Sequence, residues 1–149
     1  MRCLTATLAM VLSTLATSQA PAQEGRRYIA PRTPADTAVT PFSGAVLVGN
    51  TLYLSGKIGL TPDRMVPGSA AEEARLVLDD VKATLTAAGM TMDDLVSVQI
   101  FCSDVSHYDA FNRVYRTYFT KEFPARAFIG SGALLFGARF EVQAIAVKR

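Results

Sequence analysis

Two charged residues near the C-terminal end, Arg126 and Glu141, are the strongest candidates for chemistry, because each lies alone in an otherwise apolar run. An unpaired ion is costly to bury, so such a residue needs a partner or a cleft where water and a ligand complete its surroundings. A guanidinium binds a carboxylate through two parallel hydrogen bonds, and a carboxylate can take a proton from water. The pair would therefore suit a site for a small organic acid.

The same pattern is compatible with two simpler interpretations. The two residues could form a cross-strand ion pair, or both could be solvated charges at the rim of a sheet.

The connection between the two apolar runs contains Gly130, Gly132 and Gly137, which is typical of two strands joined by a loop or a wide hairpin.

Side chains alternate between the two faces of a strand. Arg126 should therefore share a face with Phe128, and Glu141 should share one with Gln143 and Ile145.

Earlier in the chain, the β-rich runs 45–48 and 51–56 flank Gly49-Asn50 and predict a hairpin with a primed turn. Both runs are apolar on both faces. This pattern indicates a sheet that is covered on each side.

Two helices are predicted. Ser69 and Glu72 form a Ser-x-x-Glu capping box that opens the first helix, and Gly89 supplies its C-terminal stop. Its apolar positions recur at spacings of three and four, so they should face the sheet: Ala74, Leu78, Val81, Leu85 and Ala88. Residues 95–102 alternate as a strand does, and a second helix should run from Tyr108 to about Thr120.

The predicted order is therefore β-β-α-β-α-β-β, which makes an α/β two-layer sandwich with both helices on one face of the sheet. One layer of helices leaves the other face of the sheet bare. The apolar residues on that face favour a homo-oligomer with binding clefts between subunits.

The N-terminal segment predicts export. Residues 1–20 combine Arg2, an apolar run and Ser18-Gln19-Ala20, the layout of a signal peptide cleaved after Ala20. Residues 21–39 are rich in proline and are expected to form a flexible arm before a domain at 40–149. The mature protein would be periplasmic or secreted.

Composition argues against several kinds of site. The formal net charge is +2, which gives no electrostatic case for nucleic acid or for an anionic membrane. Without the first twenty residues the only cysteine is Cys102, which is expected to be a buried structural thiol. With His107 as the single histidine, a zinc site is not expected.

Several fragments together, in order and with matching gaps, resemble the Rid family, also called the YjgF family, of imine deaminases. The fragments span about Thr40 to Arg149: Pro41-Phe42, Leu54-Ser55-Gly56-Lys57-Ile58, Ala87-Ala88-Gly89, Phe111-Asn112-Arg113-Val114-Tyr115, Phe123-Pro124-Ala125-Arg126 and Glu141-Val142-Gln143-Ala144-Ile145-Ala146-Val147. The resemblance implies a chorismate-mutase-like fold, a homotrimer and sites in clefts between subunits. It also implies hydrolysis of small imines or enamines to a 2-keto acid and ammonia, without a cofactor.

By this resemblance Arg126 holds the substrate carboxylate, Glu141 activates the attacking water, and Ser55 and Asn112 line the site. Three residues depart from the family pattern. Phe42 replaces a tyrosine and Phe128 replaces a small cysteine, which should reshape the pocket. Lys57 replaces a common glutamine, and an ammonium that reached Glu141 would weaken the carboxylate as a base.

Two functions follow. The first is an exported deaminase of 2-imino and enamine acids, whose substrate would come from an oxidase in the same compartment. The alternative is a non-catalytic trimeric binder of small carboxylates in the cell envelope. Both require the side chains of Arg126 and Glu141 to converge on one crevice that a second copy of the chain borders.

Overall fold

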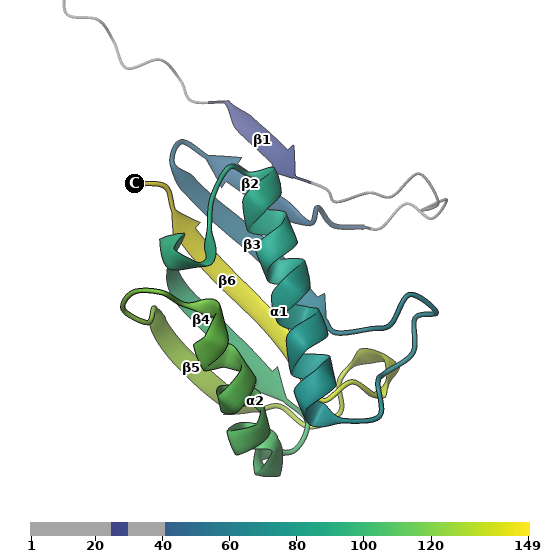
Figure 1. Ribbon diagram of the computed structural model, residues 1–149. Coiled ribbons are helices and arrows are strands. Elements are labelled where there is room, and N and C mark those ends of the chain that lie inside the picture. Colours follow the sequence, from purple (N-terminus) through teal and green to yellow (C-terminus); the bar gives the residue numbers. More distant parts are fainter. Residues whose placement is uncertain (1–24, 30–40) are drawn as a thin grey trace, which may run out of the picture.

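The computed structural model describes residues 25–29 and 41–149, which form one mixed sheet with two helices packed on one of its faces (Figure 1). The strands are β1 (Arg26–Ile29), β2 (Ala45–Val48), β3 (Thr51–Ile58), β4 (Leu95–Cys102), β5 (Ala125–Gly130) and β6 (Phe140–Val147). The helices are α1 (Ala70–Ala87) and α2 (Tyr108–Tyr115). The predicted two-layer architecture is confirmed, and the predicted elements occur in the predicted order after one further strand, β1.

The strand order is β1-β2-β3-β6-β4-β5, and only the β4–β5 pair is parallel. β6 lies between β3 and β4, so β5 and β6 do not pair with each other. The wide-hairpin interpretation of this segment is therefore wrong, because the connection after β5 crosses over β4.

The predicted arm differs from the structure at Arg26–Ile29, which form strand β1 at the edge of the sheet. Ile29 is buried, and Nη2 of Arg27 donates to the carbonyl of Ala88 at 3.2 Å, at the end of α1. These contacts give four residues of the arm a fixed place. Residues 21–24 and 30–39 of the arm and the predicted signal peptide lie outside the described residues.

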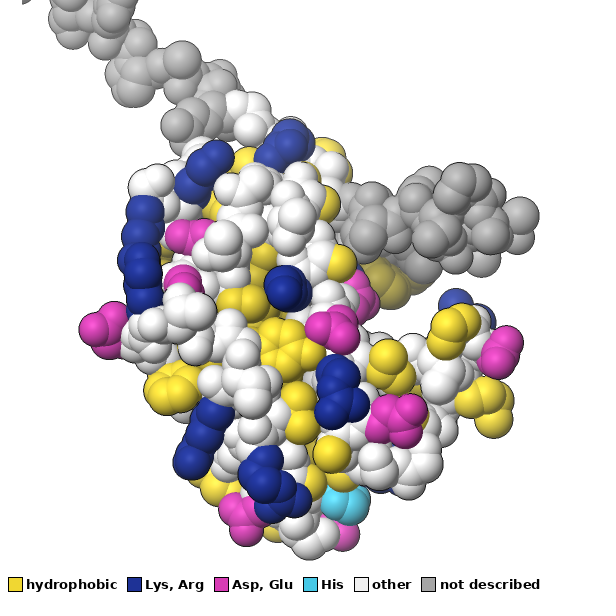
Figure 2. All heavy atoms as spheres, viewed as in Figure 1, with side chains coloured by type: hydrophobic (Ala, Val, Ile, Leu, Met, Phe, Trp, Pro, Cys, Tyr) yellow, Lys and Arg dark blue, Asp and Glu magenta, His cyan; other side chains and the backbone are white. Residues whose placement is uncertain are grey.

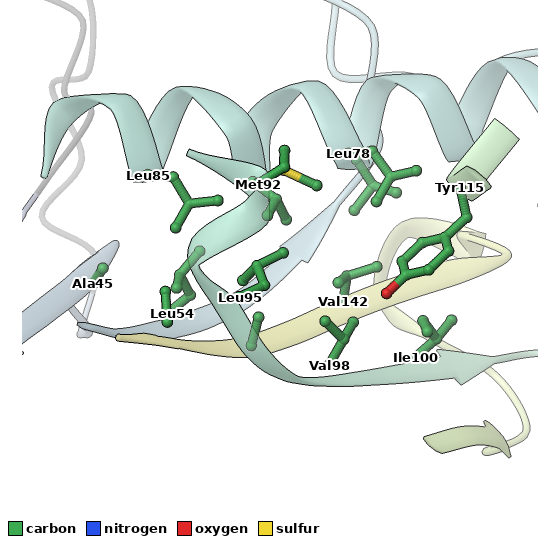
Figure 3. Close-up of a cluster of buried hydrophobic side chains, with 14 of the residues drawn as sticks. Ala45, Leu54, Leu78, Leu85, Met92, Leu95, Val98, Ile100, Tyr115 and Val142 are labelled. Carbon is green, nitrogen blue, oxygen red and sulfur yellow. The ribbon is translucent and has the colours of Figure 1, made fainter. Parts of the chain in front are cut away.

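Helix α1 begins and ends as its sequence predicts. The hydroxyl of Ser69 accepts a hydrogen bond from the backbone N–H of Glu72 at 3.2 Å, and Gly89 has a φ of 75°. The predicted apolar stripe is buried against the sheet, where it packs on residues of β3, β4 and β6 such as Leu54, Val98 and Val142 (Figure 3).

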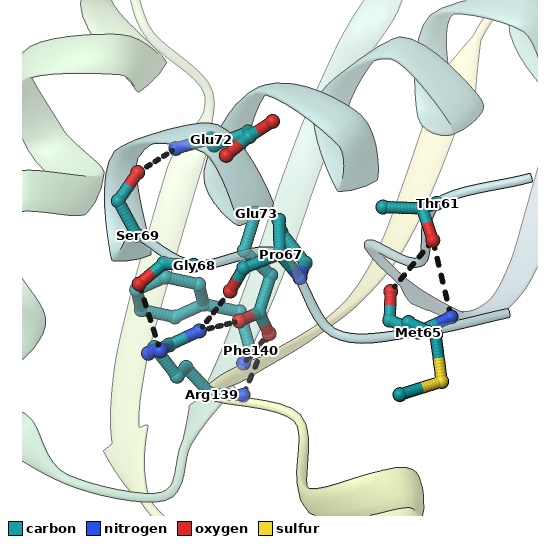
Figure 4. Close-up of polar contacts among 9 residues, drawn as sticks. All are labelled: Thr61, Met65, Pro67, Gly68, Ser69, Glu72, Glu73, Arg139 and Phe140. Atoms are coloured by element: carbon teal, nitrogen blue, oxygen red, sulfur yellow. Dashed lines mark hydrogen bonds and ion pairs between the residues drawn. The ribbon is translucent and has the colours of Figure 1, made fainter. Parts of the chain in front are cut away.

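A buried ion pair ties the start of α1 to the start of β6 (Figure 4). The side chain of Glu73 has no exposed surface, and it accepts from Nη1 of Arg139 at 2.8 Å. It also accepts from the backbone N–H groups of Arg139 and Phe140, at 2.6 and 3.0 Å. Arg139 in turn donates to the carbonyl of Pro67 at 3.0 Å. This cluster fixes the register at which β6 enters the sheet.

Strand β3 carries an irregularity at the predicted site. Leu54 pairs with Ala144 and Lys57 pairs with Val142, so β3 has one more residue than β6 between these pairs. Such a bulge lets Leu54 and Lys57 face the same side although an even number of residues separates them. Ser55 and Gly56 form the bulge itself.

Candidate active site

Arg126 lies on edge strand β5, on the face that the helices cover. It pairs with Val98, a fully buried residue of that face. Its Nη1 donates to Oδ1 of Asn112 on α2 at 2.7 Å. Asn112 is itself buried, so its amide holds the guanidinium in one orientation.

Three aromatic rings surround this guanidinium. Its central carbon lies 4.8 Å from the ring centroid of Tyr115, 5.9 Å from that of Tyr108 and 6.0 Å from that of Phe128. Cations are attracted to the faces of such rings, and the attraction is stronger where water is excluded. The rings and Asn112 together restrain Arg126, while the rest of its planar fork makes no hydrogen bond with any described residue.

Tyr115 is the closest of these rings and is buried, with 3% of its surface exposed. Its hydroxyl has no hydrogen-bond partner among the described residues, and its ring reaches from α2 toward the sheet (Figure 3). Burial raises the pKa of Tyr115 to about 12, although the positive charge of Arg126 acts in the opposite direction. The ring therefore stays neutral beside the guanidinium at ordinary pH.

Glu141 lies on the opposite face of the sheet. It pairs with Ile58 on one side and with Phe101 on the other, and its neighbours Phe140 and Val142 are the residues that face the helices. A Cβ atom added at Gly56 would overlap its Oε1 atom, so the carboxylate lies directly against the β3 bulge. Glycine at this position makes room for the carboxylate.

Within one copy of the chain, Arg126 and Glu141 do not meet. Strand β4 separates their strands, and their side chains point to opposite faces of the sheet. The cross-strand ion pair is therefore excluded, and no crevice of a single copy contains both groups. A site that uses both needs Arg126 from one copy and Glu141 from another.

The structure places the other predicted site residues in three ways. Phe128 shares the face of Arg126 and packs edge-on against Tyr108, with 5.0 Å between ring centroids. The hydroxyl of Ser55 donates to the carbonyl of Ser43 at 2.5 Å, beside the Gly56 that contacts Glu141. Phe42 precedes β2 and is 59% exposed.

Lys57, which the resemblance places at the site, lies elsewhere. Its side chain faces α1, where the ammonium forms a salt bridge of 3.2 Å with Oδ1 of Asp80. The β3 bulge directs Lys57 to the helical face, away from Glu141. Within one copy its ammonium therefore does not reach Glu141, and its place at the site stays a prediction.

The face that carries Glu141 is not covered by any described element. A hollow of about 220 Å³ lies on it, lined by Tyr53, Leu54, Ser97, Gln99, Gln143, Ala144 and Ile145. Tyr53 and Tyr28 on this face are 50% and 62% exposed. Aromatic rings on an open sheet face are typical of a surface that another protein surface covers.

Other chemistry is not supported within residues 25–29 and 41–149. No group of His, Cys, Asp and Glu side chains there could hold a metal ion, and no helix there is long and apolar enough to cross a membrane. Cys102 is buried with its thiol 3.0 Å from the carbonyl of Asp104, and burial raises the pKa of this thiol. It is a structural residue, as predicted.

Sequence reasoning missed Tyr108, Tyr115 and Gly56 as site residues. The two tyrosines lie at positions where a helix carries apolar residues, so the sequence gave no reason to distinguish them from core residues. Tyr108 lies four residues before Asn112, and Tyr115 lies three residues after it. This spacing puts all three residues on one face of α2, and it is the one available signal in the sequence for their role.

Comparisons with known proteins agree with this fold. A family model described as Endoribonuclease L-PSP matches residues 33–148. The 2-iminobutanoate/2-iminopropanoate deaminase of Capra hircus is 40% identical over 116 residues, which cover 76% of this chain and 85% of that protein. Protein HMF1 of Saccharomyces cerevisiae is also 40% identical over 116 residues, covering 77% of this chain and 90% of HMF1.

Two solved structures from E. coli have the same fold. The YjgF gene product has a TM-score of 0.75 and 35% identity, covering 83% of this chain and 99% of that one. TdcF with bound serine has a TM-score of 0.71 and 29% identity, covering 75% of this chain and 91% of that one. With matches over most of its length, the chain belongs to the Rid family, also called the YjgF family.

Proposed function

We propose that this protein is an imine deaminase of the Rid type, which hydrolyses small 2-imino acids to 2-keto acids and ammonia. The observation that carries the proposal is the restrained guanidinium of Arg126, held by Asn112 and packed against Tyr115 with part of its fork left to bind a carboxylate. Relatives that are 40% identical are named 2-iminobutanoate/2-iminopropanoate deaminase, which supports the same class of substrate.

We propose further that the active site is assembled from two copies of a homotrimer. Arg126 of one copy binds the carboxylate, and Glu141 of the neighbouring copy faces the imine carbon. The support is the arrangement within one copy, where the two groups lie on opposite faces of the sheet. The exposed rings on the face of Glu141 give the neighbouring copy an apolar surface to cover.

The reaction follows from these positions. For a protonated imine, the water oxygen forms a bond to the imine carbon, the C=N electron pair moves to nitrogen, and Glu141 takes a proton from the water. Glu141 then returns this proton to the nitrogen. The C–N bond breaks to release ammonia, which takes the hydroxyl proton as the carbonyl of the 2-keto acid forms. Arg126 fixes the acid end throughout, so the carbon stays within reach of the water.

The test is the rate at which imino acids produced in situ by an L-amino-acid oxidase lose ammonia. The wild-type protein should accelerate this loss. Arg126→Ala should lower kcat/KM mainly through KM, and Glu141→Gln should lower kcat by about 10²- to 10⁴-fold. The proposal would be overturned if the rates with wild type, with both variants and without protein were equal across several imino acids.

The binder alternative has one observation in its favour, because a single copy holds the carboxylate anchor Arg126 apart from Glu141. It requires that pyruvate raises Tm of the wild-type protein, that Arg126→Ala abolishes this shift, and that no imino acid is turned over. Turnover lost in Glu141→Gln would exclude it.

Export is proposed from residues 1–20 alone. In the full-length protein expressed in a Gram-negative host, the mature chain should begin at Pro21 in the periplasmic fraction. Mass spectrometry of that fraction tests this, and a chain that keeps its first residues in the cytosol would contradict it.

A further inference from the structure

A groove lies between the outer surfaces of α1 and α2. Its volume is about 620 Å³, and it is lined by Ala71, Arg75, Asp79, Lys82, Ala110, Arg113, Val114, Thr117, Tyr118 and Thr120. Arg126, Glu141 and the residues that contact them are absent from this lining. The volume falls within the range of about 300–1,000 Å³ that ligand sites usually have.

The groove carries an excess of positive charge. Arg75, Lys82 and Arg113 line it, and none of the three forms an ion pair with a described residue. Arg75 and Lys82 are seven residues apart on one side of α1, which places them about 10 Å apart along the helix axis. Figure 2 shows Lys and Arg side chains over the helical layer in this view.

The single carboxylate of the groove does not neutralise these cations. Oδ1 of Asp79 accepts a hydrogen bond from the hydroxyl of Tyr118 at 2.8 Å, and the same hydroxyl lies 3.2 Å from the carbonyl of Arg75. Burial and the neighbouring Asp79 raise the pKa of Tyr118, so this hydroxyl remains a donor. Asp79 therefore stays bonded to Tyr118, on the wall of the groove between the two helices.

We propose that this groove binds a small molecule that carries a phosphate or diphosphate group. A guanidinium group binds two phosphate oxygens at once, and an ammonium group binds phosphate as a point charge. Two arginines and a lysine spread along the groove therefore match several phosphate oxygens at the same time. A monocarboxylate would engage only one of these cations. The site is separate from Arg126 and lies on the helical layer, which stays open when the opposite face of the sheet is covered.

The site also borders the helix that positions Arg126. Arg113 and Val114 of α2 line the groove, while Asn112 between Phe111 and Arg113 bonds to Arg126. A ligand in the groove would therefore contact the same helix as the substrate anchor, on a different side.

Isothermal titration calorimetry with sodium pyrophosphate at low salt tests the proposal on the full protein. We expect the double variant Arg75→Gln/Arg113→Gln to bind pyrophosphate at least about tenfold more weakly than wild type, because each lost charge-assisted bond is large enough for such a change. The control is Arg26→Gln/Arg116→Gln, which removes two exposed charges outside the groove and should bind as wild type does. Circular dichroism checks that both variants are folded.

The proposal would be overturned if wild type did not bind pyrophosphate, or if citrate bound as tightly as pyrophosphate. Equal weakening in the control would overturn it as well, because it would indicate diffuse electrostatics. Arg126→Ala separates this inference from the proposed function, since it should keep pyrophosphate binding while losing turnover. Displacement of pyrophosphate by pyruvate would assign the binding to Arg126 and reject the groove.

Discussion

At the scale of single residues, the contact between Gly56 and Glu141 predicts that the proposed site requires glycine at position 56. Gly56→Ala would place a methyl group where Oε1 of Glu141 now lies. Because the obstructing atom is the end of a flexible side chain, the fold should survive and the carboxylate should move. A displacement of about 1 Å can cost about 10²-fold in rate, so kcat should fall by that order.

Gly68→Ala is the matched control for this change, because nothing lies within 4 Å of a Cβ atom added there. It should keep wild-type kcat and Tm. If Gly56→Ala keeps full activity as well, Glu141 does not act from the position that the structure gives it.

Tyr115 supports Arg126 through its ring and not through its hydroxyl. Tyr115→Phe removes a buried hydroxyl that has no partner among the described residues, so the free energy of unfolding at pH 7 should stay equal or rise by up to about 1 kcal/mol. kcat/KM should change little, because the ring face under the guanidinium remains. Tyr115→Leu, which removes the ring, should raise KM.

The pH dependence of stability gives the second readout for this residue. Burial raises the pKa of Tyr115 from 10.0 to about 12, so above pH 10 the unfolded chain loses this proton before the folded one does. Stability therefore falls as the pH rises from 10 to 12. Urea unfolding across this range should show a shallower fall in Tyr115→Phe than in wild type, and parallel curves would contradict the assignment.

At the scale of elements, the Glu73–Arg139 pair joins α1 to β6. Glu73→Ala removes the carboxylate that the partly buried guanidinium of Arg139 and two backbone N–H groups share as their acceptor. Breaking such a buried pair costs about 3–5 kcal/mol, which urea unfolding at a fixed protein concentration would measure. Glu72→Ala, an exposed neighbour on the same helix, should stay within about 0.5 kcal/mol of wild type.

The elements were predictable where local rules decide them. The N-cap at Ser69, the apolar stripe of α1 and the alternation of β4 from Val98 to Cys102 were visible in the sequence and are present. The reciprocal bond from the Glu72 side chain that a capping box needs does not form, and Val96, predicted to share the face of Val98, is exposed. The order of strands was not, because β6 enters between β3 and β4 through pairings that no local pattern encodes. The orientation of Lys57 depends on a bulge that reverses the expected alternation.

At the scale of the whole molecule, the opposite faces of Arg126 and Glu141 have a consequence that single variants cannot test. Arg126→Ala copies retain Glu141, and Glu141→Gln copies retain Arg126. At a substrate concentration well below the raised KM of Arg126→Ala, each variant alone should have little activity. In a mixed trimer, a cleft that takes Arg126 from one variant and Glu141 from the other contains both groups intact.

Co-expression of the two variants in equal amounts should therefore restore about a quarter of wild-type activity, since about one cleft in four receives both intact groups by random assembly. The control mixes Arg126→Ala with the double variant Arg126→Ala/Glu141→Gln, in which every cleft lacks the guanidinium. Native mass spectrometry establishes that mixed trimers have formed. If mixed trimers form without recovered activity, Arg126 of one copy and Glu141 of another never serve the same cleft. The two-copy site would then have to be abandoned, while the fold and the Arg126 anchor would remain as described.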